Sequence, residues 1–233
     1  IGVTALLNNT TTSQITAVGR NALRANVTSG NTAFGYAALL CNTTGNNNVS
    51  VGYQALACNT TAGDITAVGY QAAFCASSGN GSSVYVGYQA GYFNTGASSS
   101  TAIGSRALYC NATGDNNVAV GRDALCANTA NNNTAVGFQA LTANTTGIQN
   151  SALGYLAMAC NTNGEQNDAF GVVTLQKNTS GKFNSAFGGG ALRCNTTACH
   201  NTAVGYHSRC SNTTGCDNIA VGYRSAYQLT TAC

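Results

Sequence analysis

The sequence predicts an all-β fold, a parallel β-solenoid in which residues 1–233 form a single repeat domain. Three observations predict it. A glycine recurs every 16–18 residues, a large apolar residue precedes each copy, and Asn/Thr/Gly clusters follow at a fixed distance. Such self-similarity is the signature of a repeat architecture, in which each unit contacts mainly its neighbours. The repeat glycines are Gly2, Gly19, Gly35, Gly52, Gly69, Gly87, Gly104, Gly121, Gly137, Gly154, Gly171, Gly188, Gly205 and Gly222.

Each repeat has room for short strands only, since 17 residues cannot hold two helices and their turns. We count positions from the repeat glycine, which is position 0. Position −1 is always Val, Ile, Leu or Phe, and position −2 is Ala apart from Ser50 and Tyr85. β-branched residues and turn clusters recur without a helical period. A first strand is therefore expected at roughly Thr134 to Gly137 and in the equivalent part of every repeat.

A second strand and a turn complete the predicted coil. Ala at position +3 and Leu or Met at +4 predict a strand at roughly Gln139 to Ala143. The following Asn144 to Gly147 predicts a turn, because Asn and Gly accept positive φ. We therefore expect 14 turns of about 17 residues with two short strands each, stacked about 4.8 Å apart. Because Ile1 falls inside a strand, the chain is expected to be a segment of a longer fibre.

The apolar positions predict self-association. Two adjacent positions are apolar in each expected strand, and consecutive strand residues point to opposite faces. The narrow interior of the coil can bury only one of these faces. The other face is expected to pack on a further copy of the chain, as a homotrimer or a filament.

The repeat resembles a known family of surface proteins. Asn133-Thr-Ala-Val-Gly137, with the variants Thr101-Ala-Ile-Gly104 and Asn117-Val-Ala-Val-Gly121, looks like the head repeats of trimeric autotransporter adhesins. It is equally similar to repeats in tail-fibre-type proteins of phages and related surface proteins. The resemblance covers essentially the whole chain. It implies a left-handed parallel β-roll with three chains side by side, exposed on a cell or virion and used for attachment.

Composition argues against several classes of function. Only 6% of residues are charged, and the net charge of +3 is dispersed, so no nucleic-acid footprint is expected. The sequence contains no apolar run of about 18 residues, which is the length that would predict a membrane span. The acids are scattered, and His200 and His207 lack a nucleophile arrangement, so we expect neither an enzyme nor a cofactor. Cys199 beside His200 is the only pair that hints at zinc, and the spacing elsewhere does not fit.

An asparagine column marks the turn at position +7, and most of its members begin an Asn-X-Ser/Thr sequon. Two interpretations remain open. The asparagines could form a stacked amide ladder that shapes the turn, or they could carry N-linked glycans in a secreted protein. The candidate glycosylation sites are Asn9, Asn26, Asn42, Asn59, Asn111, Asn144, Asn178, Asn195 and Asn212.

The eleven cysteines favour an oxidising, extracellular compartment, although small buried thiols in a reducing cell are the alternative. Equivalent positions on neighbouring coils lie within disulfide reach. The expected pairs are Cys41–Cys58, Cys110–Cys126, Cys194–Cys210 and Cys199–Cys216, with Cys75, Cys160 and Cys233 left over. Cys58–Cys75 and Cys216–Cys233 are competing pairings, because sequence does not determine connectivity.

An aromatic column follows the glycine at position +1. Such a row could bind glycans or another protein, or it could cover the coil and pack on the next chain. Its members are Tyr36, Tyr53, Tyr70, Tyr88, Phe138, Tyr155, Tyr206 and Tyr223.

Together these features predict an extracellular structural and adhesive fibre protein on a cell or virion surface, with host or cell-surface glycans or proteins as further partners. One alternative is an ice-binding solenoid and another is the passive stalk of a viral tail fibre. The ice-binding alternative rests on a threonine row that follows the turn asparagine. The row comprises Thr10, Thr43, Thr60, Thr95, Thr129, Thr145, Thr162, Thr179, Thr196, Thr213 and Thr230.

Overall fold

The computed structural model describes residues 2–9, 12–77 and 81–231. Across these residues it contains thirteen three-residue strands and no helix. The chain divides into two compact units, Ile1–Asn117 and Val118–Cys233. The first unit holds β1 (Thr16–Val18), β2 (Thr32–Phe34), β3 (Val49–Val51), β4 (Thr66–Val68), β5 (Val84–Val86) and β6 (Thr101–Ile103). The second holds β7 (Val118–Val120), β8 (Thr134–Val136), β9 (Ser151–Leu153), β10 (Asp168–Phe170), β11 (Ser185–Phe187), β12 (Thr202–Val204) and β13 (Ile219–Val221).

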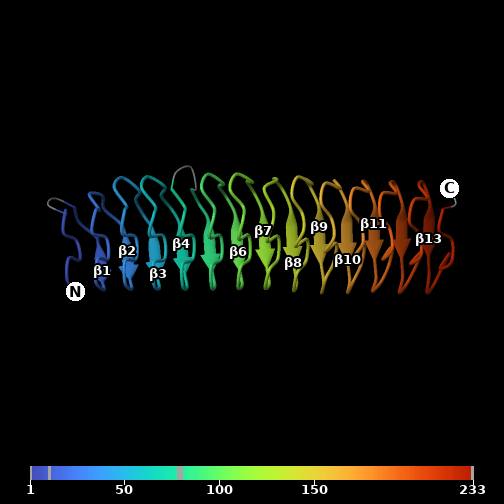
Figure 1. Cartoon of the computed structure of the whole chain (residues 1–233), viewed down its shortest axis with the longest axis horizontal. Helices are drawn as coiled ribbons and strands as arrows, with labels where there is room; N and C mark the ends of the chain where they lie inside the picture. The colour runs from blue at the N-terminus through green and yellow to red at the C-terminus, as the bar shows by residue number, and fades with distance from the viewer. Residues whose placement is uncertain (1, 10–11, 78–80, 232–233) are drawn as a thin grey trace. The chain divides into compact units, whose positions relative to one another are not determined.

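Within each unit, successive strands pair in parallel and in register, one coil apart (Figure 1). Val51 of β3 pairs with Phe34 of β2 on one side and with Val68 of β4 on the other. In the second unit, Ala152 lies between Ala135 and Ala169 in the same way. Equivalent residues therefore stack on one another. The predicted parallel β-solenoid with coils of about 17 residues is confirmed, whereas its left-handed winding stays a prediction.

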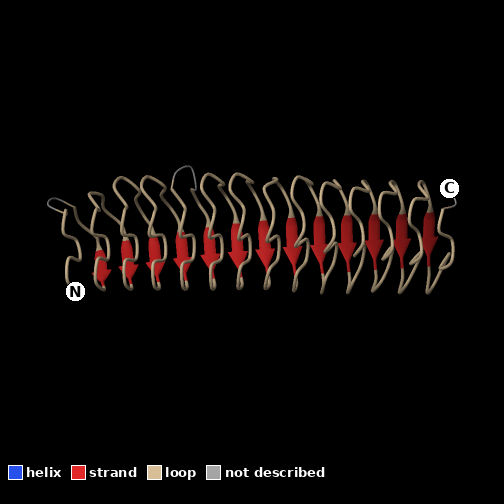
Figure 2. Cartoon of the chain, in the orientation of Figure 1, coloured by secondary structure: helices blue, strands red, loops and turns tan. Residues whose placement is uncertain are grey.

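The prediction of two strands per coil is wrong. Each coil has one strand, and the remainder is loop and turn (Figure 2). Residues at positions +2 and +4 adopt left-handed backbone conformations, as in Gln139 (φ 53°) and Leu141 (φ 51°). Left-handed residues thus alternate with other conformations along this segment, and this alternation turns the chain where a second strand was expected. Thirteen coils have a described strand instead of the expected fourteen, because the strand position of the Gly2 repeat falls at Ile1, outside the described residues.

The same alternation determines what the interior contains. In an extended strand Ala140 and Leu141 would face opposite ways, but here both are fully buried. Ala135 at position −2 is also buried, while Val136 beside it points outward and is half-buried. The interior is thus built from two alanine columns, one leucine column and the asparagines described below. The strand of each coil leaves its apolar −1 column outside.

Peptide groups bond from coil to coil in the loops as well as in the strands. The Gln139 N–H donates to the Arg122 carbonyl of the preceding coil at 2.9 Å, and the Leu141 N–H donates to the Ala157 carbonyl of the following coil at 3.0 Å. In the turn, the Thr145 N–H donates to the Thr162 carbonyl at 2.9 Å. Buried peptide groups must be hydrogen-bonded, so every coil depends on its neighbours for its irregular segments.

The repeat glycine is required for the coils to approach this closely. Gly69 has φ 136°, and a Cβ at this position would lie 2.3 Å from the carbonyl oxygen of Gly87 in the next coil. No side chain can occupy that space, and the conformation is strained for any L-residue with a Cβ.

We predict that Gly69→Ala strongly destabilises the first unit, by more than the roughly 1–3 kcal/mol of backbone strain alone, because the coils must also separate. Gly96→Ala is the matched control, since the nearest atom to its added Cβ would be 3.7 Å away. Urea unfolding followed by circular dichroism measures both. Equal midpoints for the two variants would contradict this explanation.

In one coil, two interior side chains differ from those of the other repeats, and the fold is kept. Tyr85 replaces alanine at position −2 and is fully buried, while Gly91 replaces leucine at +4. A Cβ at Gly91 would lie 2.2 Å from the Tyr85 ring, so the ring fills the space that leucine vacates. The Asn94 side chain donates to the Tyr85 hydroxyl at 2.6 Å. Burial raises the pKa of Tyr85 to about 12, although its hydrogen bond with Ser83 acts in the opposite direction.

This raised pKa predicts a loss of stability at alkaline pH. An unfolded tyrosine ionises near pH 10, so the protonated ring stabilises the fold fully below pH 10, and this contribution disappears as the pH rises through about 12. Tyr85→Phe cannot ionise. The unfolding free energy of the wild type relative to Tyr85→Phe should therefore fall by about 2–3 kcal/mol between pH 9 and pH 12. A difference between the two proteins that stays constant from pH 9 to pH 12 would contradict this explanation.

Candidate functional site

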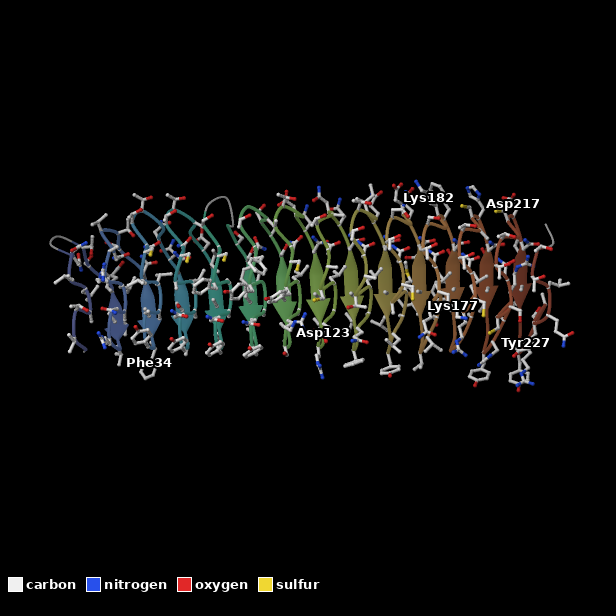
Figure 3. The ribbon with its side chains drawn as sticks, viewed as in Figure 1. Phe34, Asp123, Lys177, Lys182, Asp217 and Tyr227 are labelled. Atoms are coloured by element: carbon white, nitrogen blue, oxygen red, sulfur yellow. The ribbon has the colours of Figure 1, made fainter. Side chains whose placement is uncertain are left out.

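The outer face of the strands carries an apolar surface in each unit. Side chains at positions −3 and −1 both point outward, and large apolar residues occupy every −1 position. Phe34 is 56% exposed and Leu153 is 47% exposed, and Figure 3 places Phe34 at the outside of its coil. We call these two columns the outer sheet face. Sequence reasoning identified its −1 column and missed −3, although strand alternation places both on one side. Its most exposed apolar members are Phe34, Val49, Val84, Ile103, Val118, Leu153, Phe187, Val204, Ile219 and Val221.

The predicted aromatic row lies beside this face, one residue beyond the glycine. Rings at successive positions stack nearly parallel, with centroids 5.2 Å apart for Tyr36 and Tyr53 and 5.3 Å apart for Tyr70 and Tyr88. In the second unit, Phe138 stacks on Tyr155 and Tyr206 stacks on Tyr223. All are at least partly exposed. The rings therefore present their edges to solvent and do not cover the interior.

The turn asparagines lie inside the coil and form the amide ladder. The Asn161 side chain donates to the Asn144 side-chain oxygen at 2.7 Å and to the Gly164 carbonyl at 3.0 Å, and its own oxygen accepts from Asn178 at 2.8 Å. Asparagines at position −4 form a second ladder, as in Asn167 donating to Asn150 at 3.1 Å.

A glycan on eight of the nine candidate sites is incompatible with this fold. The side-chain nitrogen that would carry the sugar lies in the interior and, across these columns, is engaged as a hydrogen-bond donor. The eight fully buried residues are Asn26, Asn42, Asn59, Asn111, Asn144, Asn178, Asn195 and Asn212. Asn9 is half-buried.

The structure contains none of the predicted disulfides between Cys41 and Cys58 or between Cys194 and Cys210. Cys41 and Cys58 are in register, so their Cα–Cβ bonds are parallel and their Cβ atoms stay about 4.8 Å apart, beyond the usual 3.5–4.5 Å of a disulfide. Cys210 is displaced by one residue from the position equivalent to Cys194, and the Cys194 N–H donates to the Cys210 carbonyl at 3.0 Å. The thiols nevertheless stack. Burial raises the pKa of Cys58, and so do the neighbouring thiols of Cys75 and Cys41. The pair Cys110–Cys126 has one member in each unit and stays a prediction, and Cys233 lies outside the described residues.

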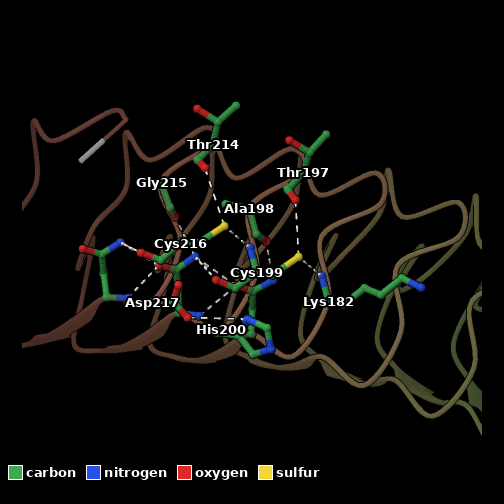
Figure 4. Close-up of polar contacts among 12 residues, drawn as sticks. Lys182, Thr197, Ala198, Cys199, His200, Thr214, Gly215, Cys216 and Asp217 are labelled. Atoms are coloured by element: carbon green, nitrogen blue, oxygen red, sulfur yellow. Dashed lines mark hydrogen bonds and ion pairs between the residues drawn. The ribbon is translucent and has the colours of Figure 1, made fainter. Parts of the chain in front are cut away.

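Two further cysteines stack at position −6 of the last coils (Figure 4). The Lys182 N–H donates to Cys199 Sγ at 3.3 Å, and the Cys199 N–H donates to Cys216 Sγ at 3.1 Å. This pair is not joined as the predicted disulfide either. Beside it, His200 Nδ1 lies 3.6 Å from Asp217 Oδ1, and the His200 ring stacks on Phe183.

In the threonine row at position +8, the members from Thr43 to Thr213 have their hydroxyl groups engaged, while Thr10 lies outside the described residues. Thr145 Oγ1 donates to the Thr162 carbonyl at 3.0 Å, and Thr162 Oγ1 donates to the Thr179 carbonyl at 3.0 Å. The hydroxyls therefore extend the ladder between coils. This use weakens the case for the row as an ice-binding lattice.

Comparison with known proteins adds no assignment. No family model, no curated protein and no solved structure matches this chain. Over residues 2–9, 12–77 and 81–231, no three His, Cys, Asp or Glu side chains are grouped to hold a metal ion. The same residues contain no helix that is long and apolar enough to cross a membrane.

The asparagine ladder leads to a further prediction. Asn161→Ala removes two donated bonds and one accepted bond and leaves buried partners unsatisfied, at about 1–3 kcal/mol for each group. We expect a loss of at least 3 kcal/mol in the unfolding free energy. Asn163→Ala, an exposed position in the same turn, should change it by less than about 0.5 kcal/mol. Similar denaturation midpoints would show that the ladder is dispensable.

Proposed function

We propose that this chain is a structural and adhesive segment of an extracellular fibre, in which the outer sheet face packs against further copies of the chain. The observation that carries the proposal is this face itself. It presents apolar side chains on coil after coil within each unit, as in Phe34 and Leu153. Exposed apolar surfaces that continue over many residues mark sites of protein association.

A second copy of the chain is the partner that fits this face best. Apolar side chains recur on it once per coil, and another copy carries the same column with the same spacing. A partner without that period would match only a few coils. With 6% charged residues, the chain also has little charge to repel a copy of itself. The resemblance to adhesin heads and tail-fibre repeats supports an assembly of three chains.

Attachment would use the surfaces that self-association leaves exposed. The aromatic row lies at the edge of the outer sheet face and offers Tyr hydroxyl groups and ring edges to host or cell-surface glycans or proteins. A passive stalk would share the assembly and lack this binding. Retention of the chain on cells or immobilised glycans, and its loss in a Tyr53→Ala and Tyr155→Ala double variant, would separate the two.

The association is tested by sedimentation equilibrium at micromolar concentration. We expect the wild-type chain to sediment at a multiple of its 23.5 kDa mass. A double variant with Phe34→Asp and Leu153→Asp, one change in each unit, should sediment as a monomer, because a charge buried between apolar faces is costly.

The matched control places the same two charges on exposed turns, as Thr44→Asp and Asn163→Asp. It should sediment like the wild type. A wild-type chain that is a folded monomer at these concentrations would overturn the proposal. Measurement of thermal hysteresis on the same samples tests the ice-binding alternative.

A further inference from the structure

The thiols of Cys199 and Cys216 form a pair that the fibre function does not use. They occupy equivalent positions on consecutive coils, preceding β12 and β13, whose register pairs Thr202 with Ile219. Both cysteines are half-buried in an outward turn, so a small ion can reach their sulfur atoms. The structure therefore holds two thiols side by side at the surface (Figure 4).

Each sulfur accepts a hydrogen bond from a backbone N–H. The donors are Lys182 N for Cys199 Sγ, at 3.3 Å, and Cys199 N for Cys216 Sγ, at 3.1 Å. Hydrogen bonds to a sulfur favour its charged form and are a regular feature of thiolate metal centres. Backbone donors are held by the register of the coils, so they are in place before any ion binds.

We propose that Cys199 and Cys216 together bind one soft monovalent cation of the Cu(I) type as a two-coordinate bis-thiolate. Thiolates select soft ions. On binding, each thiol releases its proton to solvent, two sulfur–metal bonds form, and the site changes from two neutral thiols and one cation to a complex with a single negative charge.

The spacing of the coils decides the coordination number. With the Zn–S length of about 2.3 Å as the guide to a metal–thiolate bond, two such bonds placed in line span about 4.6 Å, which is close to the roughly 4.8 Å rise between coils. A tetrahedral zinc site needs closer sulfurs and two more ligands. The described residues do not bring a third His, Cys, Asp or Glu to the pair, and the His200 ring is stacked on Phe183 with Nδ1 facing Asp217.

This pair is better suited than the stack of Cys41, Cys58 and Cys75 and than the pair Cys194 and Cys210. Burial raises the pKa of Cys210, and so does the neighbouring thiol of Cys194. In the stack of three, burial raises the pKa of Cys58 and of Cys75. A raised pKa opposes formation of the thiolates that a metal requires. Cys160 supplies a single-cysteine comparison, because the equivalent positions before and after it are Ala143 and Lys177.

The test counts Cu(I) on the reduced full chain by native mass spectrometry, with free Cu(I) buffered by bicinchoninate under anaerobic conditions. All proteins carry Cys233→Ser, because Cys233 lies outside the described residues and could replace a missing thiol. Cys199→Ser and Cys216→Ser should each retain one Cu(I) fewer than this parent. The double variant should also lose one, since the two sulfurs share a single ion.

Cys160→Ser should retain the full number, and circular dichroism must show that every variant keeps its fold. The proposal is overturned if neither single variant loses an ion, or if the double variant loses two, which would mean that each sulfur binds alone. Zn(II) in place of Cu(I) should not be retained by the pair. A Zn(II) count that falls in both single variants would overturn the two-coordinate assignment.

Discussion

Hydrogen bonds between equivalent groups of neighbouring coils are the interaction on which the rest of the structure depends. The interior contains little beyond alanine, one leucine column and asparagine, so apolar burial alone is modest for a chain of this length. Peptide groups of the strand, the loop and the turn all bond along the stack, as the Thr145 and Leu141 N–H groups show. The cost of the left-handed residues at +2 and +4 is offset because these conformations aim their N–H groups at the adjacent coils.

The asparagine ladders make the register specific as well as stable. The Asn161 side chain donates to the asparagine of one neighbouring coil and accepts from that of the other. Both bonds form only when asparagines occupy the equivalent position in the two neighbouring coils. A slip by one residue would also bring the valine column inward and expose alanine. The interior tolerates exchange only where shapes compensate, as with Tyr85 and Gly91. Arg209 is a second exception: it replaces leucine at +4, is 2% exposed and donates to Asn212 at 3.0 Å.

The stacking that closes the interior also displays rows of identical groups outside. Apolar residues occupy position −1 in every repeat, and aromatic rings and thiols recur at fixed positions in runs of neighbouring coils. The surface therefore offers one chemistry at one spacing along each such run. Such rows suit two kinds of partner. Another copy of the chain shares the full period, and a small ion needs only two neighbouring groups, as at Cys199 and Cys216. Both proposals follow from this single geometric property.

The sequence by itself determined the solenoid, its period and its first strand, because the glycine and valine columns recur in every repeat and admit one register. It also marked the aromatic row and the alternative of an amide ladder. Only the tertiary structure decided that Ala140 and Leu141 share the interior and that the sequon asparagines are buried. It also showed that stacked cysteines such as Cys41 and Cys58 remain thiols. The reason is that the alternating left-handed residues at +2 and +4 reorient side chains without changing the length of the repeat or its apolar positions. The apolar pattern of the sequence therefore does not reveal which way each of these side chains points.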